Sequence, residues 1–209
     1  MKIVTLTYTG DLVANTHLLF LNDRDVVAFD LGQRNDSFKR YIENHNLNLK
    51  AIFITHGHFD HICGLKFISK DIPLYISNED AILLTDPYKN CSSEGTHVII
   101  DNPYIALNDL DIIKIDNVEI QVINTPFHSL GSVCYMINHE DLITGDTLFK
   151  SVIGRCDLPT SCARFIDESL KRLKDIYQKY GDMNVYPGHG ENTTLKREVE
   201  KNFYMRNIK

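Results

Sequence analysis

Four side chains that can bind a metal ion fall within six residues of this sequence, His56-Gly57-His58-Phe59-Asp60-His61. On an α-helix His56 and His58 would point about 200° apart, so the segment must be a turn or loop if both bind one ion. The preceding run 51–55 is short, apolar and β-branched, which predicts a buried strand, and the apolar spacing of 62–69 predicts a helix. Ligands are commonly held where a strand of an open α/β sheet ends. The cluster therefore occupies a position suited to chemistry.

A purely structural role is the alternative for these residues. A lone histidine is more often packed or solvated than a ligand, and Asp60 can act simply as a helix cap. Three imidazoles and a carboxylate packed this closely favour metal binding instead.

Composition limits the possible functions. A chain of 209 residues that is 43% apolar can build one well-packed domain, and we expect a single domain over 1–209 with two pseudo-repeated halves, about 1–100 and 101–209. The net charge of -6 provides no basic field for nucleic acid. No apolar run approaches the roughly 20 residues of a membrane span, so we expect a cytoplasmic protein with neither a nucleic-acid nor a membrane partner.

Further donors follow other expected strands. Asp30, His128, Asp146 and His189 come at or just after the ends of strands predicted at 26–29, 117–124, 142–144 and 183–186. With the first cluster they suffice for two metal ions, and a carboxylate such as Asp146 is the natural bridge. The remaining expected elements are strands at 1–6, 15–21, 73–76 and 133–137, and helices at 37–46, 79–84, 163–180 and 195–205.

The ordered motifs resemble those of the metallo-β-lactamase superfamily. They are His56-x-His58-x-Asp60-His61, then 125–132 as Thr-Pro-Phe-His-Ser-Leu-Gly-Ser, 144–149 as Thr-Gly-Asp-Thr-Leu-Phe, and 187–190 as Pro-Gly-His-Gly. The resemblance spans nearly the whole chain. It implies an α/β fold, an αββα four-layer sandwich of two mixed β-sheets with helices outside. It also implies a dinuclear site in which one ion is held by His56, His58 and His128, the other by Asp60, His61 and His189, and Asp146 bridges them.

Within the superfamily the chain is most similar to small, single-domain relatives of glyoxalase II, the hydroxyacylglutathione hydrolases. The segment 145–159, with Gly154-Arg155-Cys156-Asp157, carries this likeness. It implies a hydrolase that cleaves a small-molecule thioester such as S-lactoylglutathione by a metal-bridged hydroxide, with Asp60 and Asp146 as catalytic residues. The cofactors implied are two divalent metal ions, zinc first, with iron or manganese as alternatives.

A second function remains open on the same fold. A persulfide dioxygenase would use one iron ion, and it shares much of the motif set, including a Gly-Arg-x-Asp segment. Arg155 has two readings, recognition of a substrate carboxylate or an ion pair within the protein.

Overall fold

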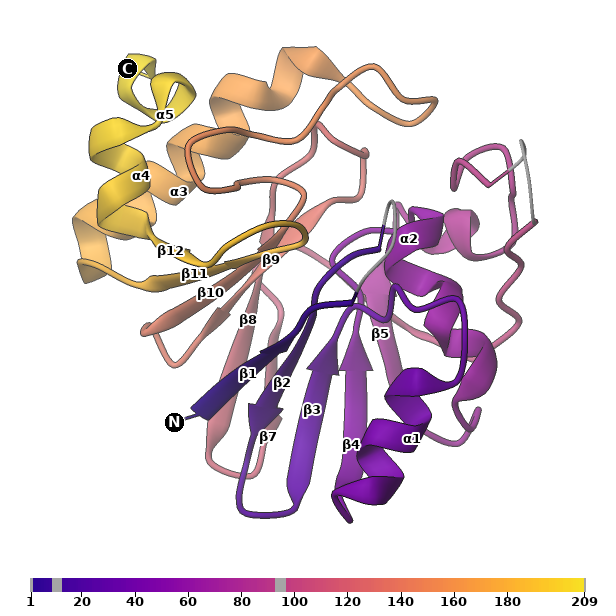
Figure 1. Cartoon of the computed structure of the whole chain (residues 1–209). Helices are drawn as coiled ribbons and strands as arrows, with labels where there is room; N and C mark the ends of the chain where they lie inside the picture. Colours follow the sequence, from indigo (N-terminus) through magenta and orange to yellow (C-terminus); the bar gives the residue numbers. More distant parts are fainter. Residues whose placement is uncertain (1, 9–12, 93–96, 209) are drawn as a thin grey trace. The chain divides into compact units, whose positions relative to one another are not determined.

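The computed structural model describes residues 2–8, 13–92 and 97–208, and it divides into two compact units, Met1–Leu107 and Asn108–Lys209. Each unit contains a six-stranded sheet and its own helices (Figure 1). The expectation of a single domain over 1–209 stays a prediction.

The sheet of the first unit is mixed. Its strands lie in the order β1 (Lys2–Leu6), β2 (Thr16–Phe20), β3 (Asp25–Phe29), β4 (Asn48–Phe53), β5 (Leu74–Ser77) and β6 (Ile105–Leu107). β1, β2 and β3 pair antiparallel, whereas β3 to β6 pair parallel. The carboxyl ends of β3, β4 and β5 therefore lie along one edge of this sheet.

Helix α1 (Ser37–Asn44) lies beside β4 in Figure 1. Its apolar side chains recur at helical spacing, so they fall on one face, and Phe38 is 2% exposed. They pack into one cluster with Val26 of β3 and Ile52 of β4. The helix predicted at 37–46 is thus confirmed and ends two residues earlier.

The helix expected at 62–69 is wrong in type. The structure has a single α-turn, α2 (Phe59–Ile62), followed by the 3₁₀ helix η1 (Cys63–Phe67). Leu31 N–H donates to the carbonyl of His61, and Gly64 N–H donates to the carbonyl of Leu31, both at 2.7 Å. These tertiary hydrogen bonds use groups that an α-helix would pair internally, which favours the tighter turn. The helix expected at 79–84 is likewise the 3₁₀ helix η2 (Ala81–Leu84).

The second unit also has a mixed sheet. Its strands lie in the order β12 (Thr193–Thr194), β11 (Asn184–Pro187), β10 (Asp141–Gly145), β9 (Val133–Ile137), β8 (Val118–Asn124) and β7 (Ile112–Ile115). β10 and β11 pair parallel and the other neighbours antiparallel. β8, β10 and β11 consequently run in one direction, and their carboxyl ends share one edge of this sheet.

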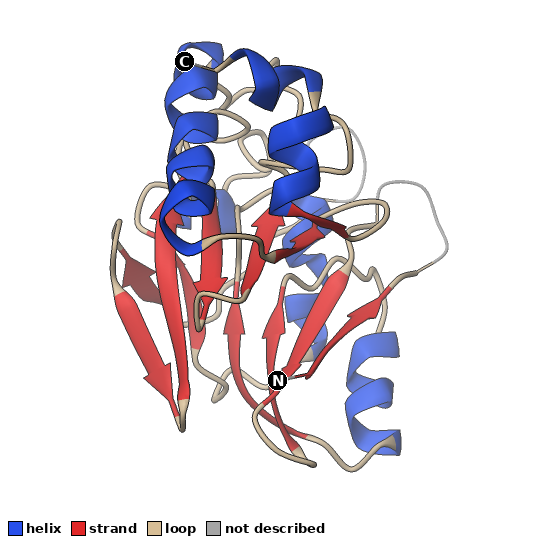
Figure 2. Cartoon of the chain, turned by 90° about the vertical axis from the view of Figure 1, so that its left-hand side faces the viewer, coloured by secondary structure: helices blue, strands red, loops and turns tan. Residues whose placement is uncertain are grey.

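Three helices, α3 (Ile166–Tyr180), α4 (Leu195–Lys201) and α5 (Phe203–Asn207), pack against this second sheet (Figure 2). Leu170 and Leu173 of α3 share a cluster with Met136 and Leu142 of the sheet. The helix expected at 195–205 is broken at Asn202, whose extended backbone ends α4 and whose side chain caps α5. None of the helices in the described part of the chain combines the length and hydrophobicity that a membrane crossing requires.

Candidate metal centre

In the first unit, the predicted histidine cluster begins shortly after β4, from which Ile54 and Thr55 separate it. His56 and His58 lie in the segment between β4 and α2, outside any helix, as their spacing required, and Asp60 and His61 lie within α2. The three histidines are at most 2% exposed and Asp60 is 9% exposed. His58 has an extended backbone at φ -66° and ψ 148°, so the helix begins only at the next residue, Phe59. This unit therefore gathers four buried donors in one short segment.

Asp30 organises the cluster from the end of β3. Its carboxylate accepts hydrogen bonds from the backbone N–H and the hydroxyl of Thr55 and from Nδ1 of His61, each at 2.8 Å. Asp30 has a positive φ of 56°, a conformation that is uncommon outside glycine and typical of functional sites. Because a carboxylate only accepts, the bond places the His61 proton on Nδ1 and leaves the lone pair on Nε2.

We expect Asp30→Asn to weaken metal binding. The amide removes the negative charge behind His61 and replaces one acceptor with a donor, so the ring loses its fixed tautomer. Losing such a partner typically costs about 10- to 100-fold in metal affinity. Competition with a chromophoric chelator measures the change. Asp25→Asn is the matched control, because Asp25 begins the same strand and also accepts side-chain hydrogen bonds, from Asn22 and Asn48. Equal metal affinity in the two variants would contradict this role for Asp30.

The second unit brings together His128, Asp146 and His189, which follow β8, β10 and β11. The Asp146 carboxylate oxygen Oδ2 lies 3.4 Å from His128 Nε2 and 3.6 Å from His189 Nε2. Asp146 and His128 are buried, and His189 is about one-third exposed. One carboxylate oxygen therefore faces two imidazole nitrogens.

These separations test whether the residues suit a metal ion. Donors about 2.1 Å from a tetrahedral ion are about 3.4 Å apart from one another. The two distances from Asp146 match that value, and they exceed the length of an ordinary hydrogen bond. In the first unit, Asp60 Oδ2 lies 3.9 Å from His61 Nε2, slightly longer. Nitrogen and carboxylate donors at such spacing fit zinc or iron.

The segment after Asp146 fixes His128. The carbonyl of Arg155 lies 2.8 Å from His128 Nδ1, and since a carbonyl only accepts, Nδ1 carries the proton and Nε2 faces Asp146. Gly154 makes this approach possible. A Cβ at that position would lie 1.9 Å from the Asp146 carbonyl oxygen and 3.1 Å from His128 Nδ1. The glycine is thus required by close packing against two candidate ligands.

The first cluster is held in position by two buried groups that the sequence analysis did not identify. Asp80, which is fully buried, accepts the N–H of Gly57 at 2.9 Å, between His56 and His58. The carbonyl of Asn90 accepts the N–H of Phe59 at 2.9 Å. Asp80 follows β5 at the same sheet edge as Asp30, so its position after a predicted strand could have identified it in the sequence. Asn90 follows no predicted strand and could not have been identified in this way.

Other reactive groups have structural partners. Arg155 binds Asp157 through two hydrogen bonds of 2.6 and 2.8 Å, and the guanidinium holds the pKa of that carboxyl below its usual range. The structure supports the interpretation of Arg155 as part of an ion pair within the protein.

Burial raises the pKa of Cys63 and of Cys134 to about 11, so both are neutral thiols near pH 7 and poor nucleophiles.

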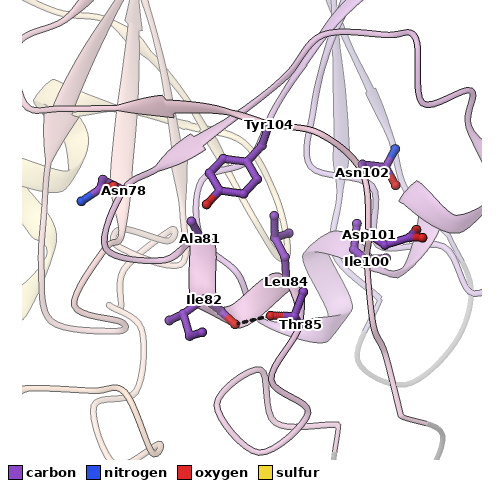
Figure 3. Close-up of a pocket in the computed structure, with 9 residues that line it drawn as sticks. All are labelled: Asn78, Ala81, Ile82, Leu84, Thr85, Ile100, Asp101, Asn102 and Tyr104. Atoms are coloured by element: carbon purple, nitrogen blue, oxygen red, sulfur yellow. Dashed lines mark hydrogen bonds between the residues drawn. The ribbon is translucent and has the colours of Figure 1, made fainter.

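A pocket of about 470 Å³ in the first unit is separate from these donors (Figure 3). It lies between η2 and the segment before β6, and Asp101 at its rim pairs with Lys70 at 2.7 Å. Its lining includes none of the predicted metal ligands. The lining residues are Asn78, Ala81, Ile82, Leu84, Thr85, Ile100, Asp101, Asn102 and Tyr104.

Comparison with known proteins places the chain in a family. The sequence pattern described as "Metallo-beta-lactamase superfamily" matches residues 6–201. A probable metallo-hydrolase of Streptococcus pyogenes is 34% identical over 198 residues, which cover 90% of this chain and 84% of that protein. A hydroxyacylglutathione hydrolase of Haemophilus influenzae is 25% identical, with 91% of this chain and 92% of that protein covered.

Solved structures agree with these relatives. The crystal structure of BLEG-1 B3 metallo-beta-lactamase matches with a TM-score of 0.86 and 28% identity, over 98% of this chain and 99% of that one. The structure of TTHA1623 in a di-iron-bound form matches with a TM-score of 0.78 and 28% identity, over 98% and 100%. The predicted fold class is thereby confirmed, because the two mixed sheets with their helices match the α/β sandwich of the metallo-beta-lactamase fold. On this evidence, the chain belongs to the metallo-beta-lactamase superfamily.

Proposed function

We propose that this protein is a metal-dependent hydrolase that cleaves hydroxyacyl thioesters, using two divalent ions held by donors from both units. Members of the superfamily have a dinuclear metal site, and the chain carries the matching histidines and aspartates. In this proposal His56, His58 and His128 hold one ion, Asp60, His61 and His189 hold the other, and Asp146 bridges them. The observation that carries it is the Asp146 carboxylate oxygen at metal-ligand spacing from two imidazoles.

Bound divalent ions would supply Lewis acidity, which makes hydroxide available near neutral pH and polarises a carbonyl. The protein side chains do the rest. Asp30 and the Arg155 carbonyl keep His61 and His128 in the tautomer that presents Nε2. In this proposal Asp60 would also act as a proton acceptor. The neutral thiols of Cys63 and Cys134 leave no competing nucleophile at either position.

The thioester specificity draws on the relative named as a hydroxyacylglutathione hydrolase and on the likeness of segment 145–159 to that group. A thiolate is a good leaving group, so a thioester needs little assistance beyond attack on its carbonyl. Zinc is the metal we propose first. Iron is the competitor, because a similar structure is described as di-iron-bound.

The test compares three substrates on protein purified without added metal. We expect two ions per chain by elemental analysis, hydrolysis of S-lactoylglutathione, loss of that activity after chelation, and recovery on adding zinc. One iron per chain together with oxygen consumption on glutathione persulfide would replace the proposal with the dioxygenase. Turnover of a chromogenic β-lactam without thioester turnover would replace it with the activity named for the BLEG-1 enzyme.

A further inference from the structure

Helix α4 contains a buried carboxylate that has no predicted role as a metal ligand. Glu198 is fully buried, which is costly for a charge unless it is paired and hydrogen-bonded. Thr193 donates its hydroxyl to Oε1 at 2.7 Å, and the Arg197 guanidinium binds the same oxygen. The other oxygen, Oε2, accepts from the backbone N–H of Ser151 at 2.8 Å and from Nδ2 of Asn202 at 3.0 Å. Both oxygens of Glu198 are therefore hydrogen-bonded, and the bond from Ser151 joins the helix to a distant segment of the chain.

That bond reaches the loop that follows Asp146, here named the 148–155 loop. A β-bridge between Leu148 and Ile153 closes it, and Ser151 at its tip has a positive φ of 74°. A positive φ is strained for serine and needs support from the surroundings. Support comes from α4 and its C-cap at three points. The Ser151 N–H donates to Glu198, the Arg197 guanidinium donates to the Ser151 hydroxyl at 3.0 Å, and Asn202 Nδ2 donates to the Val152 carbonyl at 3.1 Å.

The end of the same loop touches the candidate metal centre. Gly154 packs on the Asp146 backbone, and the Arg155 carbonyl accepts the Nδ1 proton of His128. We propose that Glu198 is a positioning residue, which holds the 148–155 loop so that His128 and Asp146 keep the geometry that binds metal. The inference rests on the proposed function only in taking His128 and Asp146 as metal ligands.

The test is Glu198→Gln, which keeps the side-chain shape but removes the charge and turns one acceptor into a donor. We expect the ion bound by His128 to bind about 10- to 100-fold more weakly, as when a partner behind a ligand is lost, while the other ion is affected less. Chelator competition gives the two affinities, and the absorption spectrum of the cobalt-substituted protein reports the coordination. A lower unfolding temperature alone would not change both the affinity of the ion bound by His128 and the cobalt absorption spectrum.

Two control variants separate positioning from stability. Glu200→Gln makes the same change on an exposed residue of α4, and it should match the wild type in both measurements. Thr193→Val removes a donor to Oε1 but spares the bond from Ser151, so it should lower the unfolding temperature without changing metal affinity. Folded Glu198→Gln protein with wild-type affinities, or a Thr193→Val variant that loses affinity equally, would overturn the inference.

A milder variant covers the case in which Glu198→Gln does not fold. Asn202→Ser retains an oxygen that caps α5 but removes the Nδ2 donor to Glu198 and to the Val152 carbonyl. We expect weaker binding of the same ion, and unchanged binding overturns the inference. If the wild type binds two ions but hydrolyses no thioester, only the proposed function fails. If it hydrolyses thioester and Glu198→Gln binds metal normally, only this inference fails.

Discussion

Replacing Asp146 with alanine should abolish hydrolysis while leaving the protein folded. The carboxylate oxygen faces both His128 and His189, so its loss removes the proposed bridge and leaves two imidazoles without a shared anionic partner. Metal ions contribute several kcal/mol of transition-state stabilisation, so we expect kcat/KM for S-lactoylglutathione to fall by about a thousandfold or more. Elemental analysis should show fewer than two ions per chain.

The matched control is Asp23→Ala, which removes an exposed carboxylate from the turn between β2 and β3. It should retain metal content and activity. Asp146→Ala protein that kept full thioesterase activity would refute the bridging assignment directly.

Gly154→Ala should damage the same centre through sterics alone. Gly154 has no positive φ, so alanine can adopt its backbone conformation, and the added Cβ decides the outcome. That carbon would lie 1.9 Å from the Asp146 carbonyl oxygen, which is backbone and cannot swing aside. The backbone of Asp146 or of the 148–155 loop must move instead. A displacement of about 1 Å in a catalytic site can cost about a hundredfold in rate.

We therefore expect kcat/KM for the thioester to fall about a hundredfold in Gly154→Ala, with a loss of about 1–3 kcal/mol in the free energy of unfolding from overpacking. Steady-state kinetics and chemical denaturation measure the two effects. Val152→Ala, a change at a half-exposed residue of the same loop, should alter neither. Wild-type kinetics in Gly154→Ala would show that the loop relaxes without disturbing Asp146.

The strands and the donors that follow them were predictable because their signals are local. The apolar run from Ala51 to Ile54, whose first three residues end β4, lies just before the histidine cluster, and β8 alternates in polarity from Val118 to Val122. The alternation fails at the last two residues, Ile123 and Asn124, and Ile123 is 4% exposed because it packs with α3. The sequence gives the residue type of each donor directly, and hydrophobic patterning predicts that the donor follows a strand.

Features that depend on contacts between distant residues were not predictable. η1 replaces an α-helix because the Leu31 backbone pairs with His61 and Gly64, some thirty positions away. Likewise, the bond between Ser151 and Glu198 joins residues 47 positions apart. β7 was also missed. Ile112 is 50% exposed at the sheet edge, so pairing with β8 rather than burial defines that strand.

The parallel pairing of β3, β4 and β5, and the shared direction of β8, β10 and β11, have an evolutionary consequence. His56, His128, Asp146 and His189 lie within a few residues of the strand ends. The longer connections leave from the same edges and contribute no ladder hydrogen bonds. Insertions or replacements in those connections change what surrounds a substrate while the ligands stay anchored to the sheets. A fold arranged in this way can exchange one hydrolysable substrate for another by remodelling its rim and still inherit the same reactive centre.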